Sequence, residues 1–362
     1  MKAAATPEHR PPGARLLVID AGGRLHHAPR SELPRFLRAG DLVVANDAAT
    51  LPASLHGLHL ASGRTVEVRL AGRRSLAVDD VHEFIAVVFG EGDHRMRTED
   101  RPPPPPLHAG DRLALGPLRA QVLRTLDHPR LVALRFEGTP DTIWAGLARH
   151  GKPVQYAHVP QPLALWDVWT SVAALPVAFE APSAGFLLDW HLLHTLRDRG
   201  VDFATLTHAA GLSSTGDAAL DARLPLAEPY HLPAATVRAI EAARAQRGRV
   251  VALGTTVTRA LEHAACRGPL RAGHGVATQR LGPHDFGWLR VVDAVVTGTH
   301  EPGTSHHGLL HAFAPAALLR QVDQALEARA YRTHEFGDSV LIERQPTRPL
   351  REARQRAFSH AA

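Results

Sequence analysis

The segment that most constrains the fold of this 362-residue chain is residues 249–263, R-V-V-A-L-G-T-T-V-T-R-A-L-E-H. A short apolar run meets a glycine, two threonines follow, and apolar residues then recur at helical spacing. This pattern predicts a buried strand, a tight turn and a helix. The N-terminus of such a helix presents backbone N–H groups without a partner inside the helix, and these suit a carboxylate or a phosphate.

The small and polar residues of this junction are candidates for substrate binding. Gly254 lets the chain turn and approach a ligand closely, while Thr255 and Thr256 can cap the helix. Arg259 lies one turn into the helix and is expected to point back toward the same opening. The alternative interpretation is an ordinary capped helix after a core strand, because the local pattern fits that arrangement too.

Length and apolar content favour a globular protein with two domains, since 44% apolar residues can build more than one core. No apolar run reaches the roughly 18 residues of a membrane span, and the first residues lack the apolar core of a signal peptide. We therefore expect a cytoplasmic protein without a membrane partner, and favour a monomer. The single cysteine, Cys266, excludes intramolecular disulfides and thiolate-based metal clusters.

The formal charge of +5 comes almost wholly from arginine, because Lys2 and Lys152 are the only lysines. Guanidinium groups bind phosphates and carboxylates in a bidentate manner, so an anionic partner such as RNA is allowed. It is not required, since the arginines are scattered along the chain rather than clustered.

The 24 histidines raise the question of a metal site. The groups considered are His191 with His194, and the set His300, His306, His307 and His311. No spacing of histidine and carboxylate there matches a metal-binding motif, and histidine is enriched along the whole chain. We therefore expect no metal.

The first fifty residues contain two apolar segments, 14–20 and 41–45, that predict strands, and residues 31–37 between them predict a short helix. The second strand ends in Asn46 and Asp47. Polar residues at the end of a buried strand are where open α/β sheets place ligand groups, although an Asx-turn explains them equally well.

From about residue 52 to residue 136 the chain changes to short alternating segments separated by Gly, Asp and Pro. The segments are 65–70, 83–89, 112–115, 120–126 and 131–136. They predict a small antiparallel β-barrel. Because α/β patterns stand on both sides, we expect an inserted barrel domain at 52–140, an α/β domain at 1–51 and 141–346, and a basic tail at 347–362.

The second half of the chain alternates predicted helices and strands, which indicates an α/β domain with a mixed sheet. Helices are predicted at 142–149, after 181–185, at 233–246 and over 309–331, and strands at 201–206, 289–297 and 338–342. Ser183 and Gly185 precede one helix, His208 follows one strand, and Thr297 and His300 follow another. Ligands gather at the carboxyl ends of such strands, so we expect these groups to line one cleft with the junction at Gly254.

Taken in order, these segments make the chain resemble the S-adenosylmethionine:tRNA ribosyltransferase-isomerases of queuosine biosynthesis. The matching runs are R-L-L-V at 15–18, G-D-L-V-V-A-N-D at 40–47, L-P-A-S-L-H-G at 51–57, A-P-S-A-G at 181–185, T-H at 207–208, G-T-T-V-T-R-A-L-E at 254–262, V-D-A-V-V-T-G-T-H-E-P at 292–302 and Y-R-T-H-E-F-G-D-S-V-L-I at 331–342. No single run is decisive, but their joint order is specific.

The resemblance implies an α/β domain interrupted by a β-barrel, and an unusual reaction. The ribosyl part of S-adenosylmethionine, a substrate rather than a cofactor, is transferred to the aminomethyl-deazaguanine wobble base of tRNA. It isomerises to an epoxy-cyclopentanediol, and adenine and methionine are released. This chemistry needs a base beside the sulfonium, donors for departing adenine and a site that excludes water. His208, His300 and Asp47 are the expected catalytic residues.

Several polar positions of the family pattern differ here. Ala48 and Ala49 replace Thr-Arg, and Ser54 replaces an arginine. L-W-D-V-W-T-S-V-A at 165–173 stands where the family has R-Y-Q-T-V-Y-A, Phe186 and Leu187 replace Leu-His, residues 210–214 blur a G-x-G-T-F run, and T-G-T-H-E-P at 297–302 replaces T-N-F-H-L-P. Scaffold residues are retained better than polar site residues, which is typical of a diverged paralogue.

Three functions are compatible with these residues. The first is the family reaction on tRNA, and the second is a paralogous enzyme that binds S-adenosylmethionine or a related nucleoside but modifies another acceptor. The third is a non-catalytic binding protein of the same fold.

Overall fold

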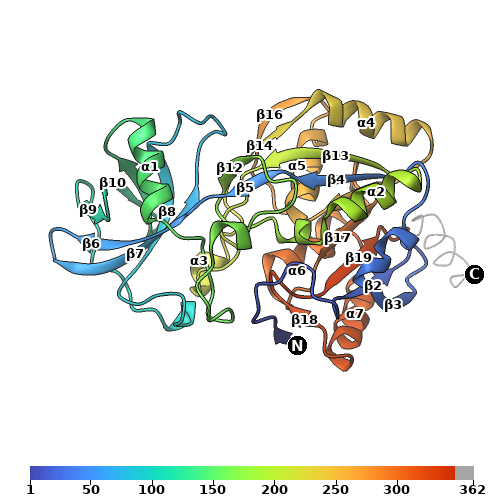
Figure 1. Ribbon diagram of the computed structural model, residues 1–362, viewed down its shortest axis with the longest axis horizontal. Helices are drawn as coiled ribbons and strands as arrows, with labels where there is room; N and C mark the ends of the chain where they lie inside the picture. Colours follow the sequence, from blue (N-terminus) through green and yellow to red (C-terminus); the bar gives the residue numbers. More distant parts are fainter. Residues whose placement is uncertain (347–362) are drawn as a thin grey trace, which may run out of the picture.

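The computed structural model describes residues 1–346 and contains a nine-stranded sheet and a closed six-stranded barrel. The two bodies lie side by side, with the barrel on the left of the ribbon drawing and the sheet on the right (Figure 1). This architecture confirms the predicted α/β fold with an inserted antiparallel barrel. The predicted basic tail, 347–362, lies outside the described residues, and the predicted domain boundaries stay a prediction.

The large sheet is mixed. Its strands, in spatial order, are β16 (Gly273–Ala277), β14 (Glu228–Leu232), β13 (Asp202–His208), β4 (Leu42–Asn46), β15 (Val250–Leu253), β17 (Ala294–Gly298), β19 (Ser339–Glu343), β2 (Arg15–Ile19) and β3 (Leu25–Pro29). The central strands β13, β4, β15 and β17 are parallel, whereas β19 runs antiparallel to β17. The carboxyl ends of four neighbouring strands therefore meet at one edge.

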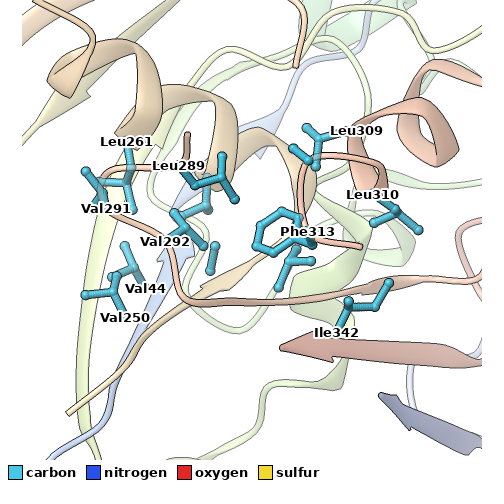
Figure 2. Close-up of a cluster of buried hydrophobic side chains, with 14 of the residues drawn as sticks. Val44, Val250, Leu261, Leu289, Val291, Val292, Leu309, Leu310, Phe313 and Ile342 are labelled. Atoms are coloured by element: carbon cyan, nitrogen blue, oxygen red, sulfur yellow. The ribbon is translucent and has the colours of Figure 1, made fainter. Parts of the chain in front are cut away.

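Successive residues of the central strands point to opposite faces of the sheet, and each face has its own core. Val44 and Val250 pack with α4 (Ala234–Ala245), α5 (Thr255–Ala265) and α7 (Ala316–Ala328). Val43 and Val251 pack on the other side with Leu196 of α2 (Trp190–Asp198) and with residues around η1 (Arg30–Phe36). Figure 2 shows the first core, where Leu261 and Phe313 cover the sheet. Burial on both faces explains why these strands are continuous apolar runs.

The barrel consists of β6 (Ser54–His59), β7 (Arg64–Gly72), β8 (Glu83–Phe89), β9 (Arg112–Leu115), β10 (Leu118–Leu126) and β11 (His128–Phe136). Alternate residues, such as Val66, Val68 and Leu70, fill its interior. Helix α1 (Pro140–His150) packs Ile143 and Leu147 against the same core.

The remaining elements are short. They are β1 (Lys2–Ala3), β5 (Ala48–Thr50), η2 (Thr98–Asp100), η3 (Leu165–Asp167), β12 (Leu175–Ala178), η4 (Ser183–Leu187), α3 (Ala218–Asp221), η5 (Pro283–Asp285), α6 (Ser305–Leu310) and β18 (Arg332–Thr333). No helix within residues 1–346 is long and apolar enough to cross a membrane.

Two predicted elements differ from the structure for identifiable reasons. The strand predicted at 289–297 begins only at Ala294, because the Glu262 carboxylate binds the N–H groups of residues 290–292 and removes them from the sheet ladder. The helix predicted at 309–331 is divided into α6 and α7, since Pro315 cannot continue a helix and instead caps the second one.

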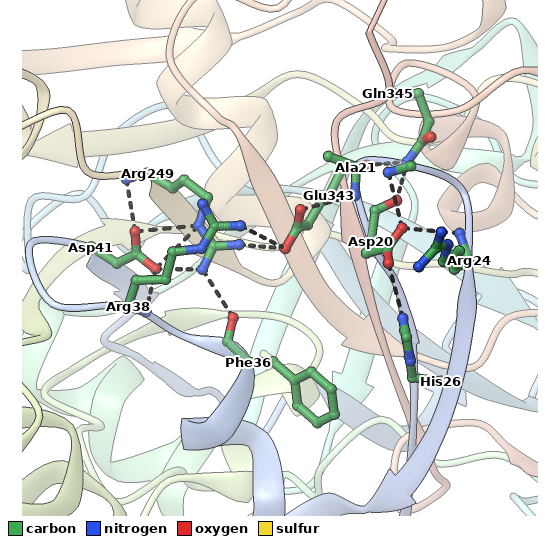
Figure 3. A network of polar contacts seen from close by, with 11 residues as sticks. Asp20, Ala21, Arg24, His26, Phe36, Arg38, Asp41, Arg249, Glu343 and Gln345 are labelled. Atoms are coloured by element: carbon green, nitrogen blue, oxygen red, sulfur yellow. Dashed lines mark hydrogen bonds and ion pairs between the residues drawn. The ribbon is translucent and has the colours of Figure 1, made fainter.

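A buried ion-pair network closes the edge of the sheet opposite the four carboxyl ends (Figure 3). Arg249, just before β15, binds both Asp41 and Glu343, which belong to the segments entering β4 and leaving β19. Burial alone raises the pKa of Asp41, but hydrogen bonds from Arg249 outweigh it and leave that pKa lowered. This network fixes the register of three strands without occupying the candidate site.

Candidate active site

The sheet brings the sequence-predicted strand ends to one edge. In the ladder Leu206 lies beside Asn46, Leu253 beside Ala45, and Val296 beside Leu253. Asn46, His208, Gly254 and Gly298 therefore end or follow four parallel strands at the same edge, where open sheets bind ligands.

The turn at Gly254 has the geometry that its sequence predicts. Its φ is 105°, a region that residues with a side chain rarely adopt, and helix α5 starts at the next residue. A small pocket of ≈ 50 Å³ lies at this helix start and is lined by Thr255, Thr256 and Arg259 together with His306.

Arg259 lines that pocket, but most of its donors are used within the protein. Its guanidinium forms a buried ion pair with Glu228 and donates to the carbonyl oxygens of Leu226 and Ala277, both at 2.8 Å, and of Gln279 at 2.9 Å. The expected contact of Arg259 with a substrate carboxylate stays a prediction.

His208 is fully buried behind Arg259, and its Nε2 lies 3.2 Å from a carboxylate oxygen of Glu228. Burial and the nearby charge of Arg259 lower the pKa of His208 to about 3, so the imidazole is neutral at physiological pH. Its expected catalytic role stays a prediction.

Asn46 and Asp47 connect β4 to β13. The Asn46 amide donates to the carbonyl oxygen of His208 at 2.9 Å and accepts from the His208 N–H at 2.9 Å. The Asp47 carboxylate accepts from the Thr207 hydroxyl at 2.7 Å. Both side chains hold the sheet edge in shape, whatever contacts they make with a ligand.

A cavity near this edge has a volume of ≈ 630 Å³, within the range of small-molecule sites. Its polar lining includes the predicted residues Ser183 and His300. It also includes Tyr156, His158, Glu180, Glu301, His306, His334 and Glu335, and Arg97 and Glu99 from the loop between β8 and β9. His306 lines both this cavity and the pocket at Thr255, so the two spaces adjoin.

Two threonines predicted as site residues position two of the cavity histidines. Thr297 Oγ1 lies 2.8 Å from His300 Nε2, and Thr255 Oγ1 lies 2.8 Å from His306 Nδ1. The two imidazole rings stack with their centroids 4.8 Å apart. Desolvation lowers the pKa of both histidines, so each imidazole is neutral at physiological pH.

A carboxyl group with the opposite shift faces the same cavity. Burial raises the pKa of Glu180 to about 7, although hydrogen bonds from Tyr156 and Ser213 oppose the shift. The Tyr156 hydroxyl donates to Glu180, and desolvation raises the tyrosine pKa well above its usual value. The cavity thus combines neutral bases with an acid that is partly protonated near neutral pH.

Gly185 is buried in η4, where a Cβ would come within 2.8 Å of the Thr170 side chain. Close packing therefore accounts for this glycine. The sequence interpretation did not identify Tyr156, Glu180, His158, His334 or Glu335 as site residues. They lie in irregular segments and a turn that carry no periodic pattern.

Comparison with known proteins gives a consistent result across the chain. A family model described as "Queuosine biosynthesis protein" matches residues 1–342. The S-adenosylmethionine:tRNA ribosyltransferase-isomerase of Thermosynechococcus vestitus is 35% identical over 336 residues, covering 91% of this chain and 89% of the relative. The protein of the same name from Sorangium cellulosum is 35% identical over 366 residues, covering 94% of each chain.

A crystal structure of the S-adenosylmethionine tRNA ribosyltransferase from Thermotoga maritima aligns with a TM-score of 0.48 at 23% sequence identity, covering 94% of this chain and 95% of the other. The extent of the family match and the identity to the two relatives decide the assignment: this chain belongs to the queuosine biosynthesis protein family.

Proposed function

We propose that this protein transfers and isomerises the ribosyl moiety of S-adenosylmethionine onto the aminomethyl-deazaguanine wobble base of tRNA. Family membership over residues 1–342 supports the reaction class. The observation that carries the proposal is the cavity at the carboxyl edge of the sheet, which places neutral histidines and a partly protonated carboxyl group around one space. The proposed enzyme acts in the cytoplasm as a monomer.

In this proposal, His300 is the base that removes a proton beside the sulfonium. Its imidazole is neutral and held by Thr297, so a free nitrogen can face the cavity. Glu180, with a pKa of about 7, is the acid that helps adenine to leave. Ser183 and the amide-rich start of α5 contribute to S-adenosylmethionine binding.

Recognition of tRNA requires positive charge beside the cavity, because phosphate contacts dominate affinity for nucleic acids. Arg69 and Arg73 do not provide this charge, because both are buried. Arg69 forms an ion pair with Glu67, and Arg73 donates hydrogen bonds to two backbone carbonyl groups. Arg97 lines the cavity and is 70% exposed, although Glu99 pairs with it. We propose Arg97 as a phosphate-binding residue.

A second candidate function is transfer to a different acceptor. Ala48 and Ala49, which replace Thr-Arg in the family pattern, are buried in β5, where they pair with β12. Ser54 donates to Glu67 inside the barrel wall. No cation occupies these three buried positions, so two arginines of the family pattern are missing, which suits a less anionic acceptor.

The deciding experiment incubates the protein with S-adenosylmethionine and tRNA that carries the aminomethyl-deazaguanine base. Adenine and methionine release is followed by mass spectrometry, and tRNA lacking that base is the control. Release of both products only with the modified tRNA supports the proposal. Binding of S-adenosylmethionine without release supports the second candidate, and absence of binding overturns both in favour of a non-catalytic protein.

A further inference from the structure

Three side chains on the cavity wall converge although they come from two distant segments of the chain. One possible ligand atom from each of His158, His334 and Glu335 lies within 4.8 Å of the others. His158 Nε2 is already 2.8 Å from Glu335 Oε2, and the rings of His158 and His334 stack at 4.1 Å. All three residues line the ≈ 630 Å³ cavity.

The turn that carries His334 and Glu335 is held firmly in place. His334 adopts a φ of 69°, which is unfavourable for a residue with a side chain, and its carbonyl accepts from the Gly337 N–H at 2.9 Å. A Cβ at Gly337 would come within 2.4 Å of the Arg332 carbonyl oxygen, so the turn requires glycine there. Phe336 anchors the turn by stacking on Phe186 at 5.3 Å.

We propose that His158, His334 and Glu335 form a binding site for a divalent first-row transition metal ion of the Zn²⁺ type. Two imidazoles and one carboxylate are a common ligand set of zinc sites that keep a coordination position open, whereas Mg²⁺ and Ca²⁺ prefer oxygen ligands throughout. The open position faces the cavity. No sequence motif marks this site, because residue 158 is far from residues 334 and 335 in the chain.

The site needs only side-chain movement to close around an ion. Tetrahedral ligands about 2.1 Å from a metal lie roughly 3.4 Å apart. The candidate atoms lie within 4.8 Å of one another, so no separation must shrink by more than about 1.4 Å, and the 2.8 Å pair must widen slightly. The His334 side chain is exposed and can rotate toward the pair already formed by His158 and Glu335.

The test uses Co²⁺ and Zn²⁺ on the full-length protein. Cobalt bound by two imidazoles and a carboxylate gives visible absorption bands, and calorimetry with Zn²⁺ gives stoichiometry and affinity. We expect one tight site per chain, and on the order of 100-fold weaker binding or more in His334→Asn and in Glu335→Gln. Asparagine tolerates the left-handed backbone at residue 334, so this variant removes the ligand without adding strain.

His274→Ala is the matched control, because His274 stacks on His231 at 4.5 Å in a histidine pair on β16 and β14. We expect this variant to bind Zn²⁺ as the wild type does. Thermal unfolding curves check that each variant is folded. The proposal is overturned if Zn²⁺ binds only weakly, if both site variants retain wild-type affinity, or if His274→Ala loses as much affinity as they do.

Discussion

Arg259 and Glu228 form a buried ion pair close to the turn at Gly254. The pair joins the first turns of α5 to β14, and the remaining donors of Arg259 bind backbone carbonyl groups. Arg259 therefore supports the architecture of the site in addition to any contact with a ligand.

This arrangement predicts that Arg259→Ala is strongly destabilising. The substitution leaves the Glu228 carboxylate buried without its cation, which typically lowers the free energy of unfolding by about 3–5 kcal/mol. Urea denaturation of Arg259→Ala and of the double variant Glu228→Gln with Arg259→Met measures the effect. The double variant should recover part of the loss, and equal stability of the wild type and Arg259→Ala would contradict the ion pair.

Arg259→Ala also tests whether Arg259 binds substrate, in addition to its effect on stability. If the sequence-based expectation holds, folded Arg259→Ala also binds S-adenosylmethionine more weakly in calorimetry, because a guanidinium that contacts the carboxylate is lost. An unchanged affinity in the folded variant would assign Arg259 to the scaffold alone.

The fold could be predicted where local sequence and burial agree. The strand predicted at 250–253 is β15, because both of its faces are buried and its pattern is continuous. Strand β6 has no clear strand pattern in the sequence. Leu55 and Leu58 are three residues apart, whereas a strand pattern repeats every two residues, and Gly57 weakens the pattern further. The structure explains that glycine, since a Cβ there would come within 1.9 Å of the Ala114 carbonyl oxygen.

The site was predictable only at the ends of regular elements. The strand-end rule brings Asn46, His208 and Gly254 to one edge, as the parallel register shows. Glu180 and His334 lie in an irregular segment and a turn, whose conformations depend on tertiary contacts such as the stacking of Phe336 on Phe186. No periodic signal in the sequence marks these positions.

His208 is expected to make stability depend on pH in the acidic range. Its pKa is about 3 in the folded state and about 6.5 when unfolded. The unfolded chain therefore binds an extra proton between these values, so the stabilising contribution is complete above pH 6.5 and declines as pH falls toward 3.

The difference between the wild type and His208→Gln isolates this contribution from that of Glu228. We expect the stability advantage of the wild type to fall by on the order of 3–5 kcal/mol from pH 7 to pH 3. Urea denaturation at several pH values measures it. A difference that does not vary with pH would show that His208 is not buried in its neutral form.

Glu180 should make stability depend on pH in the opposite direction from His208, so that stability falls as pH rises. Its folded pKa of about 7 lies above the unfolded value, so ionisation costs stability as pH rises from about 4.5 to 7. Glu180→Gln should stabilise the protein by about 1–3 kcal/mol at pH 8 and leave it nearly unchanged at pH 4. Thermal unfolding at both values checks this, and destabilisation at pH 8 would contradict the raised pKa.

Catalysis should depend on the pair formed by His300 and Thr297. His300→Ala removes the proposed base and should lower kcat about 10²–10⁴-fold while S-adenosylmethionine still binds. Thr297→Val should lower kcat less, because the imidazole remains but loses the hydroxyl that positions it, and Thr297→Ser should restore most of the rate. Steady-state release of adenine measures all three, and full activity of His300→Ala would exclude it as the base.

The last prediction concerns the acceptor. Arg97 is the exposed guanidinium on the cavity wall, so Arg97→Ala should weaken tRNA binding and reduce the slope of log affinity against log salt by about 1. Affinity for S-adenosylmethionine should not change. The control is Arg74→Ala, because Arg74 is 73% exposed and pairs with Glu83 of the barrel in the way that Arg97 pairs with Glu99.

Fluorescence anisotropy with labelled tRNA at several salt concentrations gives both slopes. A reduced slope for Arg97→Ala alone places the tRNA backbone at the mouth of the cavity, where the wobble base could enter. Equal slopes for the wild type and Arg97→Ala would leave the cavity mouth without a phosphate contact at this position. Ala48, Ala49 and Ser54 carry no charge and cannot supply the missing phosphate contact. Equal slopes would therefore favour an acceptor other than tRNA.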